Sequence, residues 1–261
     1  MTTFSEQFPI VFQALNVGFL QTLKLFFVTL IGAIPLGLII SFGSMSRWSP
    51  LGFLRPYLKN LPKDGKLTWW QKTQLWFAVD FRPIRLIVRF VIWVVRGTPL
   101  MLQLLVFYYF PGLVLHKNIW GSGEAGRFLA SSIAFIFNYA CYFSEIFRGG
   151  IQAVNVGQME AARSLGLPYG RAMRKVILPQ AVRIVIPSMV NQFIITLKDT
   201  SILYAIGLPE LMQSGSLIVA RTFRSFEVWA TVAVIYFIII FILSKISKRI
   251  ERRLHNGKGK G

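Results

Sequence analysis

Long apolar segments are the feature that most constrains how this chain can fold. Five of them lie near residues 19–43, 99–115, 128–148, 186–206 and 228–246. A helix crosses the hydrocarbon core of a bilayer with about 20 largely apolar residues, and it bonds its own backbone polar groups there. Charged residues make up only 15% of the chain, whereas soluble domains carry roughly 25%. The sequence therefore predicts an all-α membrane protein with about five transmembrane helices.

The distribution of lysine and arginine predicts the orientation of these helices. Cytoplasmic loops near a membrane carry an excess of both residues. The connections at 46–96 and 152–182 and the tail at 245–253 are strongly basic. The opposite loops hold only Lys117 and Arg127, then Arg221 and Arg224. We therefore expect the N-terminus outside and the C-terminus in the cytoplasm.

The connection after the first predicted span contains several prolines and the pair Trp69-Trp70, which is typical of loops and short helices against lipid headgroups. Over 82–96, arginines fall on one side of a helical wheel and favour an interfacial helix. A span over 84–96 is rejected because it is too short and carries arginines. We expect Thr98 to cap the second span, with Pro99 in its first turn.

These features divide the chain into four expected parts. They are an N-terminal segment with the first helix at 1–45, a cytoplasmic insertion with the interfacial helix at 46–96, a core with the other four helices at 97–246, and a basic tail at 247–261. The N-terminus has no basic residue before Lys24, so we expect no cleaved signal peptide. The final residues HNGKGKG are expected to be disordered.

Composition excludes several classes of function. The formal charge is +19, but long apolar runs separate the basic residues, so we expect no nucleic acid as a partner. The single cysteine, Cys141, cannot form an internal disulfide, and His116 and His255 are too far apart to build a metal site with it. No Gly-x4-Gly-Lys-Ser/Thr phosphate loop occurs. We therefore expect no catalytic residue, cofactor or metal in this chain.

The most informative stretch lies in the basic connection at 152–182. It reads Gly157-Gln158-Met159-Glu160-Ala161-Ala162-Arg163-Ser164-Leu165-Gly166-Leu167-Pro168, followed by Val176-Ile177-Leu178-Pro179-Gln180-Ala181. Good helix formers followed by Gly166 and Pro168 predict a short helix, and a second short helix is expected to run to Pro179. Two compact helices at this place predict a rigid knob that docks into a soluble partner.

This stretch resembles the EAA motif of the permeases of binding-protein-dependent ABC importers. The motif is Glu-Ala-Ala, three residues, Gly, nine residues and Ile-x-Leu-Pro. Its positions are matched by Glu160, Ala161, Ala162, Gly166, Leu178 and Pro179. Val176 stands where the family usually has isoleucine. Stretches 96–100, 145–151 and 191–201 are similar to the polar amino-acid class of these permeases.

The resemblance implies a type I importer permease in the bacterial plasma (inner) membrane. ATP and Mg would bind to two partner ATPase subunits, and the matched motif would carry the closure of these subunits to the membrane spans. The other implied partners are a second permease subunit, identical or related, an external solute-binding protein and a polar amino acid. The lipid bilayer surrounds the assembly.

Polar residues inside the predicted spans mark a candidate substrate pathway, because charged groups in a membrane usually face a cavity or a partner. They form one stripe on the third predicted helix and another on the fourth. The candidates are Gln103, Asn138, Tyr142, Glu145, Asn191, Gln192, Asp199 and Thr200. Two alternatives stay open: Glu145 pairs with Arg148, or Asp199 pairs with a basic residue of a neighbouring helix.

Two other classes of function compete with the importer. A self-contained channel or secondary transporter could use the same polar stripes, but it has no need for a docking knob. A membrane-bound enzyme would need a nucleophile and base or a cluster of ligands, and the two histidines lie in a loop and in the tail. Glu145 and Asp199 slightly favour a cationic amino acid, while acidic and amide side chains stay open.

Overall fold

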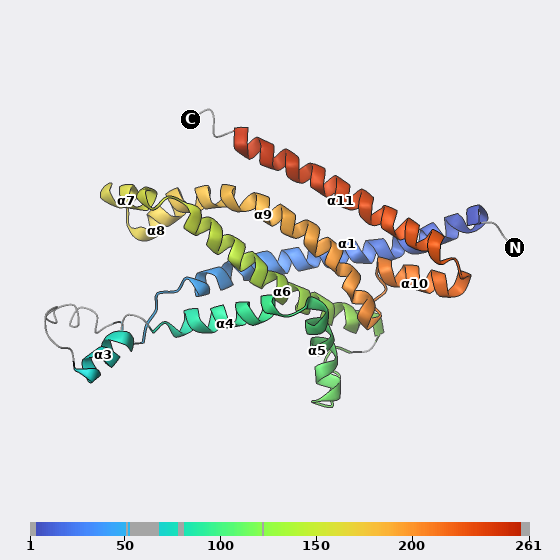
Figure 1. Ribbon diagram of the computed structural model, residues 1–261, viewed down its shortest axis with the longest axis horizontal. Helices are drawn as coiled ribbons and strands as arrows, with labels where there is room; N and C mark the ends of the chain where they lie inside the picture. The colour runs from blue at the N-terminus through green and yellow to red at the C-terminus, as the bar shows by residue number, and fades with distance from the viewer. Residues whose placement is uncertain (1–3, 51, 53–67, 78–80, 122, 257–261) are drawn as a thin grey trace.

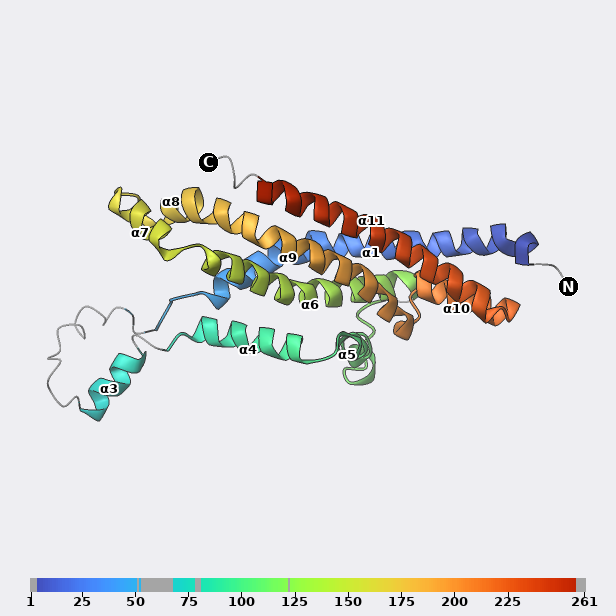
Figure 2. The same ribbon diagram turned by 45° about the horizontal axis from the view of Figure 1, so that its top comes forward.

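The structure is a computed structural model that describes the chain apart from residues 1–3, 51, 53–67, 78–80, 122 and 257–261. All regular elements of this described part are helices. Most run lengthwise in one elongated bundle, and α5 lies across it (Figure 1 and Figure 2). The bounds are α1 Phe4–Ser44, α3 Trp69–Leu75, α4 Pro83–Gly97, α5 Leu100–Leu113, α6 Gly123–Ala153, α7 Val156–Ser164, α8 Tyr169–Ala172, the π-helical turn η3 Met173–Ile177, α9 Leu178–Asp199, the 3₁₀ helix η4 Thr200–Ile206, α10 Leu211–Thr222 and α11 Ser225–Asn256.

Membrane-spanning helices dominate the described part of the chain. Four stretches are long and apolar enough to cross a bilayer: Phe8–Ser44, Gly123–Ala153, Tyr169–Ile206 and Ser225–Arg252. The helices α4 and α5 meet the same test only together, as a pair bent by 106°. The predicted all-α membrane architecture of about five spans is therefore confirmed.

The second span differs from the sequence prediction. On its own α5 has 14 residues, which reach about 21 Å at 1.5 Å per residue, less than the ~30 Å of a hydrocarbon core. The preceding helix α4, expected as an interfacial helix, packs against the bundle. It runs lengthwise beside α1 and α6 and buries Ile92 and Val95 against them (Figure 1). One broken unit, α4 with α5, thus replaces the predicted straight helix.

Pro99 explains the break between α4 and α5. Proline has no N–H to continue a helix, and it favours extended backbone in the residue before it. Thr98 accordingly has φ −119° and ψ 148°. The predicted cap of α5 by Thr98 is wrong, because the Thr98 hydroxyl donates to the Val94 carbonyl at 2.9 Å instead. The α5 helix begins without a side-chain cap.

The pair α1 and α6 forms the most extensive helix contact in the bundle. Glycines on α1 permit it. A Cβ on Gly32 would lie 2.6 Å from Ile136 of α6, and a Cβ on Gly37 would lie 2.8 Å from the Phe143 Cβ and 2.9 Å from the Ala140 carbonyl oxygen. Small residues let helix backbones approach closely in a membrane, where van der Waals contact drives association. The position of α6 is therefore set by α1.

The later helices are longer than predicted. The second short helix of the 152–182 connection does not end at Pro179, because α8, η3 and α9 run on together. Pro179 lies directly after the π-helical turn η3, and π-helical turns commonly accommodate such irregularities within a continuous helix. The α11 helix extends into the predicted tail as far as Asn256. In the insertion, α3 is a short helix as predicted. The predictions for 53–67, 78–80 and 257–261 lie outside the described residues.

The α1–α6 contact makes a prediction about stability. Gly37→Ala should lower the thermal unfolding midpoint in detergent, because the new methyl group meets α6 backbone that cannot move aside; overpacking of this kind costs about 1–3 kcal/mol. Gly149→Ala on α6 is the matched control, since no atom lies within 4 Å of its would-be Cβ. Both changes gain the same helix propensity. Equal midpoints for the two variants would contradict the close contact.

Candidate functional site

The helix α6 carries a line of polar side chains that joins it to the bent α4–α5 unit. The buried Asn138 amide donates to Gln103 Oε1 at 2.8 Å. The Gln103 Nε2 lies 2.6 Å from the Val95 carbonyl, 3.0 Å from the Thr98 carbonyl and 2.6 Å from the Thr98 hydroxyl. These carbonyls end α4 and have no partner within the helix. Gln103 therefore closes the end of α4 and holds the bend against α6.

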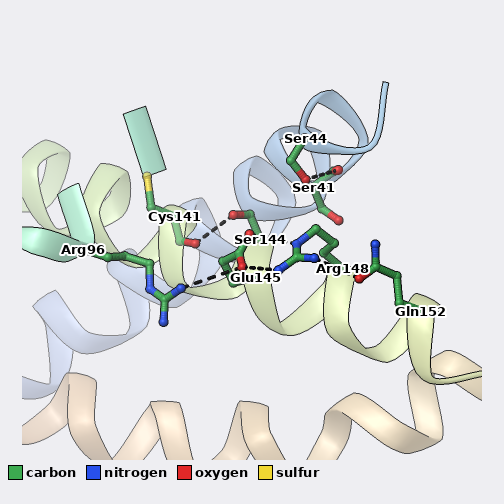
Figure 3. A network of polar contacts seen from close by, with 8 residues as sticks. All are labelled: Ser41, Ser44, Arg96, Cys141, Ser144, Glu145, Arg148 and Gln152. Carbon is green, nitrogen blue, oxygen red and sulfur yellow. Dashed lines mark hydrogen bonds and ion pairs between the residues drawn. The ribbon is translucent and has the colours of Figure 1, made fainter. Parts of the chain in front are cut away.

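Glu145 lies further along the same line, between two arginines (Figure 3). Arg148 donates from Nε to Glu145 Oε1 at 3.0 Å and from Nη2 to Oε2 at 2.5 Å, while its Nη1 donates to Gln152 at 2.8 Å. Arg96 of α4 lies 3.8 Å from Glu145 Oε2, and its guanidinium stacks 5.2 Å from the centre of the Tyr142 ring. The alternative Glu145–Arg148 pair is thus present, in the two-point geometry that strengthens such pairs.

A hollow opens beside this ion-pair cluster. Its volume is about 440 Å³, and its lining residues are Arg89, Ile92, Trp93, Arg96, Gly97, Tyr142, Glu145 and Arg148. Small-molecule sites commonly measure about 300–1,000 Å³. The guanidiniums can pair with a carboxylate and Glu145 can accept from an ammonium group, so the hollow offers partners for both charged groups of a free amino acid.

Asp199 at the end of α9 has a partner that sequence reasoning did not identify. The Tyr139 hydroxyl donates to Asp199 Oδ2 at 2.6 Å. Tyr139 is buried, but it lies about 100° round the helix from Asn138 and so falls outside the polar stripe. The bond joins α6 to α9. A basic partner for Asp199 is not among the ion pairs of the described residues.

The remaining candidates, on α9 and at the start of η4, do not line the hollow. Gln192 and Thr200 are buried, and the Thr200 hydroxyl of η4 donates to the Leu197 carbonyl of α9 at 2.7 Å. Asn191 is exposed. The structure therefore brings Tyr142 and Glu145 to one place, joins Gln103 to Asn138 at a second, and leaves the α9 residues apart from both.

The predicted short helix of the 152–182 connection is α7, and its ends are well defined. The Asn155 side chain accepts from the Gly157 N–H at 2.8 Å and caps the N-terminus. At the other end Gly166 has φ +81°, the Gly166 N–H bonds to the Arg163 carbonyl, and the Leu167 N–H bonds to the Ala162 carbonyl. This is a Schellman motif, which needs a left-handed residue and favours glycine there.

The helices α7 and α8 project as a hairpin from one end of the bundle (Figure 1). Glu160, Ala161, Gly166 and Pro179 are exposed, whereas Ala162 is buried and Leu178 partly buried. At the hairpin base, buried Val154, Ile177 and Ala181 form one apolar cluster with the partly buried side chains around them. The hairpin is thus rigidly attached to the end of α6 and the start of α9, with the acidic residue of its motif facing outward.

Glu210 is a further polar residue that sequence reasoning missed. It lies between η4 and α10, outside the candidate spans, and its side chain is 1% exposed. Its carboxylate accepts from the Met212 and Gln213 N–H groups at 2.9 and 2.8 Å and caps α10. Burial raises the pKa of the Glu210 carboxyl to about 7, and the two backbone hydrogen bonds oppose this shift. The only sequence signal was an isolated acid before a helix.

The raised pKa of Glu210 makes stability depend on pH. The unfolded chain releases this proton near its ordinary pKa of 4.5, and the folded chain holds it until about 7. Because the folded state binds more protons in that window, stability falls as pH rises from about 4.5 to 7. Glu210→Gln should flatten this part of the curve of unfolding midpoint against pH. A slope as steep as that of the unchanged protein would contradict the assignment.

The bond between Tyr139 and Asp199 makes a second prediction for this site. Tyr139→Phe should destabilise the fold by about 1.5–3 kcal/mol, the range for a hydrogen bond to a charged group. Tyr142→Phe keeps the ring that stacks on Arg96 and is the matched control. Chemical unfolding followed by tryptophan fluorescence measures both. If both variants lower the free energy of unfolding equally, the bond between Tyr139 and Asp199 makes no special contribution to the contact between α6 and α9.

Comparison with known proteins follows this geometry. Residues 75–256 match the family of binding-protein-dependent transport system inner membrane components. The chain is 38% identical over 174 residues to the arginine transport system permease protein ArtQ of Bacillus subtilis (strain 168), covering 67% of this chain and 77% of ArtQ. It is 32% identical over 229 residues to the octopine transport system permease protein OccM of Rhizobium meliloti, covering 86% and 85% of the two chains.

A solved structure agrees with these relatives. A chain from the crystal structure of an amino acid ABC transporter with histidines superposes with a TM-score of 0.76 at 32% identity, over 97% of this chain and 99% of that one. In the part of the chain that the structure describes, no three His, Cys, Asp or Glu side chains gather as metal ligands. Since the family match runs from α3 to the end of α11, the chain belongs to the binding-protein-dependent transport system inner membrane components, which are transport subunits and not enzymes.

Proposed function

We propose that this chain is the membrane-spanning permease subunit of an ATP-driven importer for a polar amino acid. The observation that carries the proposal is the α7–α8 hairpin, which presents Glu160 and Ala161 outward on a rigid apolar base. A self-contained carrier has no use for such a docking element. The relatives named as arginine and octopine permeases and the similar amino acid transporter chain support a polar amino acid as the solute.

The proposed assembly places the hairpin in the cytoplasm of a bacterial cell, at the inner face of the plasma membrane. There it meets two ATPase subunits, which bind ATP and Mg. A second permease subunit completes the pathway, and an external solute-binding protein delivers the amino acid. The strongly basic segments of the sequence support this orientation, with the N-terminus outside and the C-terminus inside.

Coupling runs through the base of the hairpin. Val154 follows α6, while Ile177 and Ala181 lie at and beyond the start of α9. A displacement of the hairpin by closing ATPase subunits therefore moves both helices together. These helices carry Glu145 and Asp199, so the motion reaches the polar residues within the bundle. It exposes these residues alternately to each side of the membrane.

The hollow beside Glu145 is the proposed place where the amino acid passes this subunit. The solute's carboxylate pairs with Arg96, whose 3.8 Å contact to Glu145 is the weaker of the two ion pairs, and its ammonium group binds to Glu145. The slight preference for a cationic side chain loses support, because Glu145 is already paired with arginine and Asp199 accepts from Tyr139. The charges nearby favour a neutral or acidic side chain.

Reconstitution with the partner subunits tests this function. With the ATPase and solute-binding subunits present, one class of amino acid should stimulate ATP hydrolysis and drive uptake. Glu160→Ala should abolish that stimulation while the chain still folds, because the hairpin loses its outward acid. Lys117→Ala, an exposed change in the opposite loop, is the control and should leave stimulation intact.

The same assay separates the permease from its competitors. Uptake without ATP or partner subunits would contradict the proposal and favour a self-contained carrier. In the pathway, Arg96→Gln should raise the solute concentration needed for half-maximal uptake at unchanged basal ATP hydrolysis. If uptake by the Arg96→Gln variant depends on solute concentration as in the unchanged protein, the hollow is not part of the pathway. The proposed role of the hairpin is independent of that result.

A further inference from the structure

Three arginines at the start of α4 line two hollows other than the one beside Glu145, and Arg89 lines that one as well. Arg82, Arg85 and Arg89 face a hollow of about 420 Å³ that also touches the end of α1, the end of α6 and the α8–η3 segment. The same three arginines line a second hollow of about 440 Å³ together with Trp76, Phe81 and Leu86. Among the described lining residues of both hollows, none is acidic.

The positive charge of these arginines is not balanced by the described part of the protein. The ion pairs found there join Arg96 and Arg148 to Glu145, and Arg224 to Glu227, so Arg82, Arg85 and Arg89 take part in none. The Arg82 Nε is enclosed and has no hydrogen-bond acceptor. An enclosed donor without an acceptor costs about 1–3 kcal/mol, more for a charged group. Within the described residues these three arginines therefore have no counter-ion, and an anion bound there would supply one.

The surroundings of the arginines are those of a lipid. Leu86, Ile87, Phe90 and Trp93 on α4 are all more than half exposed, at 59–71%. They continue along the helix from the hollow that Leu86 and Trp76 help to line. This end of α4 lies at the same end of the bundle as the α7–α8 hairpin (Figure 2). In the proposed orientation it is therefore at the inner leaflet, where the anionic lipids of a membrane meet basic segments.

We propose that Arg82, Arg85 and Arg89 bind the phosphate headgroup of an anionic phospholipid of the cytoplasmic leaflet. The guanidiniums hold the phosphate by charge-assisted hydrogen bonds, including one from the enclosed Arg82 Nε. The acyl chains lie along the exposed apolar side of α4. The bound lipid fills the space between α4, the end of α1 and α8, and so fixes the start of the bent α4–α5 unit. This inference uses the proposed orientation but not the transport activity.

Native mass spectrometry of the purified chain, exchanged into nanodiscs of phosphatidylglycerol and phosphatidylcholine, tests the proposal. The unchanged protein should retain phosphatidylglycerol in preference to phosphatidylcholine. The triple variant Arg82→Gln, Arg85→Gln, Arg89→Gln should lose this preference at least about tenfold. The matched control Arg163→Gln, Arg171→Gln, Arg174→Gln removes the same charge from exposed hairpin positions and should keep it. Equal loss in the control, or no loss in the triple variant, would overturn the proposal.

Two further arms identify the anion and guard against misfolding. The triple Arg→Lys variant keeps the charge, and it should retain phosphatidylglycerol more weakly because lysine lacks the planar fork; retention equal to that of the unchanged protein would mean that charge alone attracts lipid, without a built site. Inorganic phosphate should not displace the lipid, and displacement would assign the site to free phosphate. If the Gln variant keeps its lipid but no longer binds the ATPase subunit, the arginines serve a protein interface and the lipid proposal is wrong.

Discussion

Helices in a bilayer gain little by hiding apolar surface from one another, so close van der Waals contact has to hold them together. In this bundle that contact is most extensive between α1 and α6, where Gly32 and Gly37 let the two backbones approach. The α6 helix in turn bonds to α4–α5 through Asn138 and to α9 through Tyr139. The placement of the polar residues on α6 therefore depends on the close contact of α6 with α1.

The polar side chains along α6 have two roles. Near the bend, Gln103 donates to the Val95 carbonyl, which Pro99 leaves without a backbone donor, and Asn138 donates to Gln103; this is a structural role. Towards the hairpin, Glu145 holds two arginines beside a hollow, and one of the two contacts is long enough to be exchanged for a ligand. Charged groups in the low dielectric of a membrane interior are costly unless paired. Pairing with Arg148 keeps Glu145 charged without fixing Arg96.

Sequence reasoning succeeded where the physical signal is local and failed where it is not. Hydropathy and length predicted the spans represented by α1, α6, α9 and α11, and the glycine and proline after Ser164 predicted the end of α7. The break at Pro99 was visible, but the Thr98 hydroxyl could either accept from an N–H of α5 as a cap or donate to the Val94 carbonyl of α4, and a sequence does not rank the two. Gln103 and Asn138 are 35 positions apart, and Tyr139 and Asp199 are 60 apart, so their bonds follow from helix packing. Glu210 gave no periodic pattern at all.

The central claim is that the α7–α8 hairpin is the docking element for a partner ATPase, and hydrogen–deuterium exchange tests it most directly. Amide exchange is measured over residues 156–180 in the purified chain, alone and with the ATPase subunit added. The account predicts slower exchange in α7 and α8 on addition, with no change in α10 at the other end of the bundle (Figure 1). Unchanged exchange in the hairpin, with protection appearing elsewhere in the chain, would contradict it.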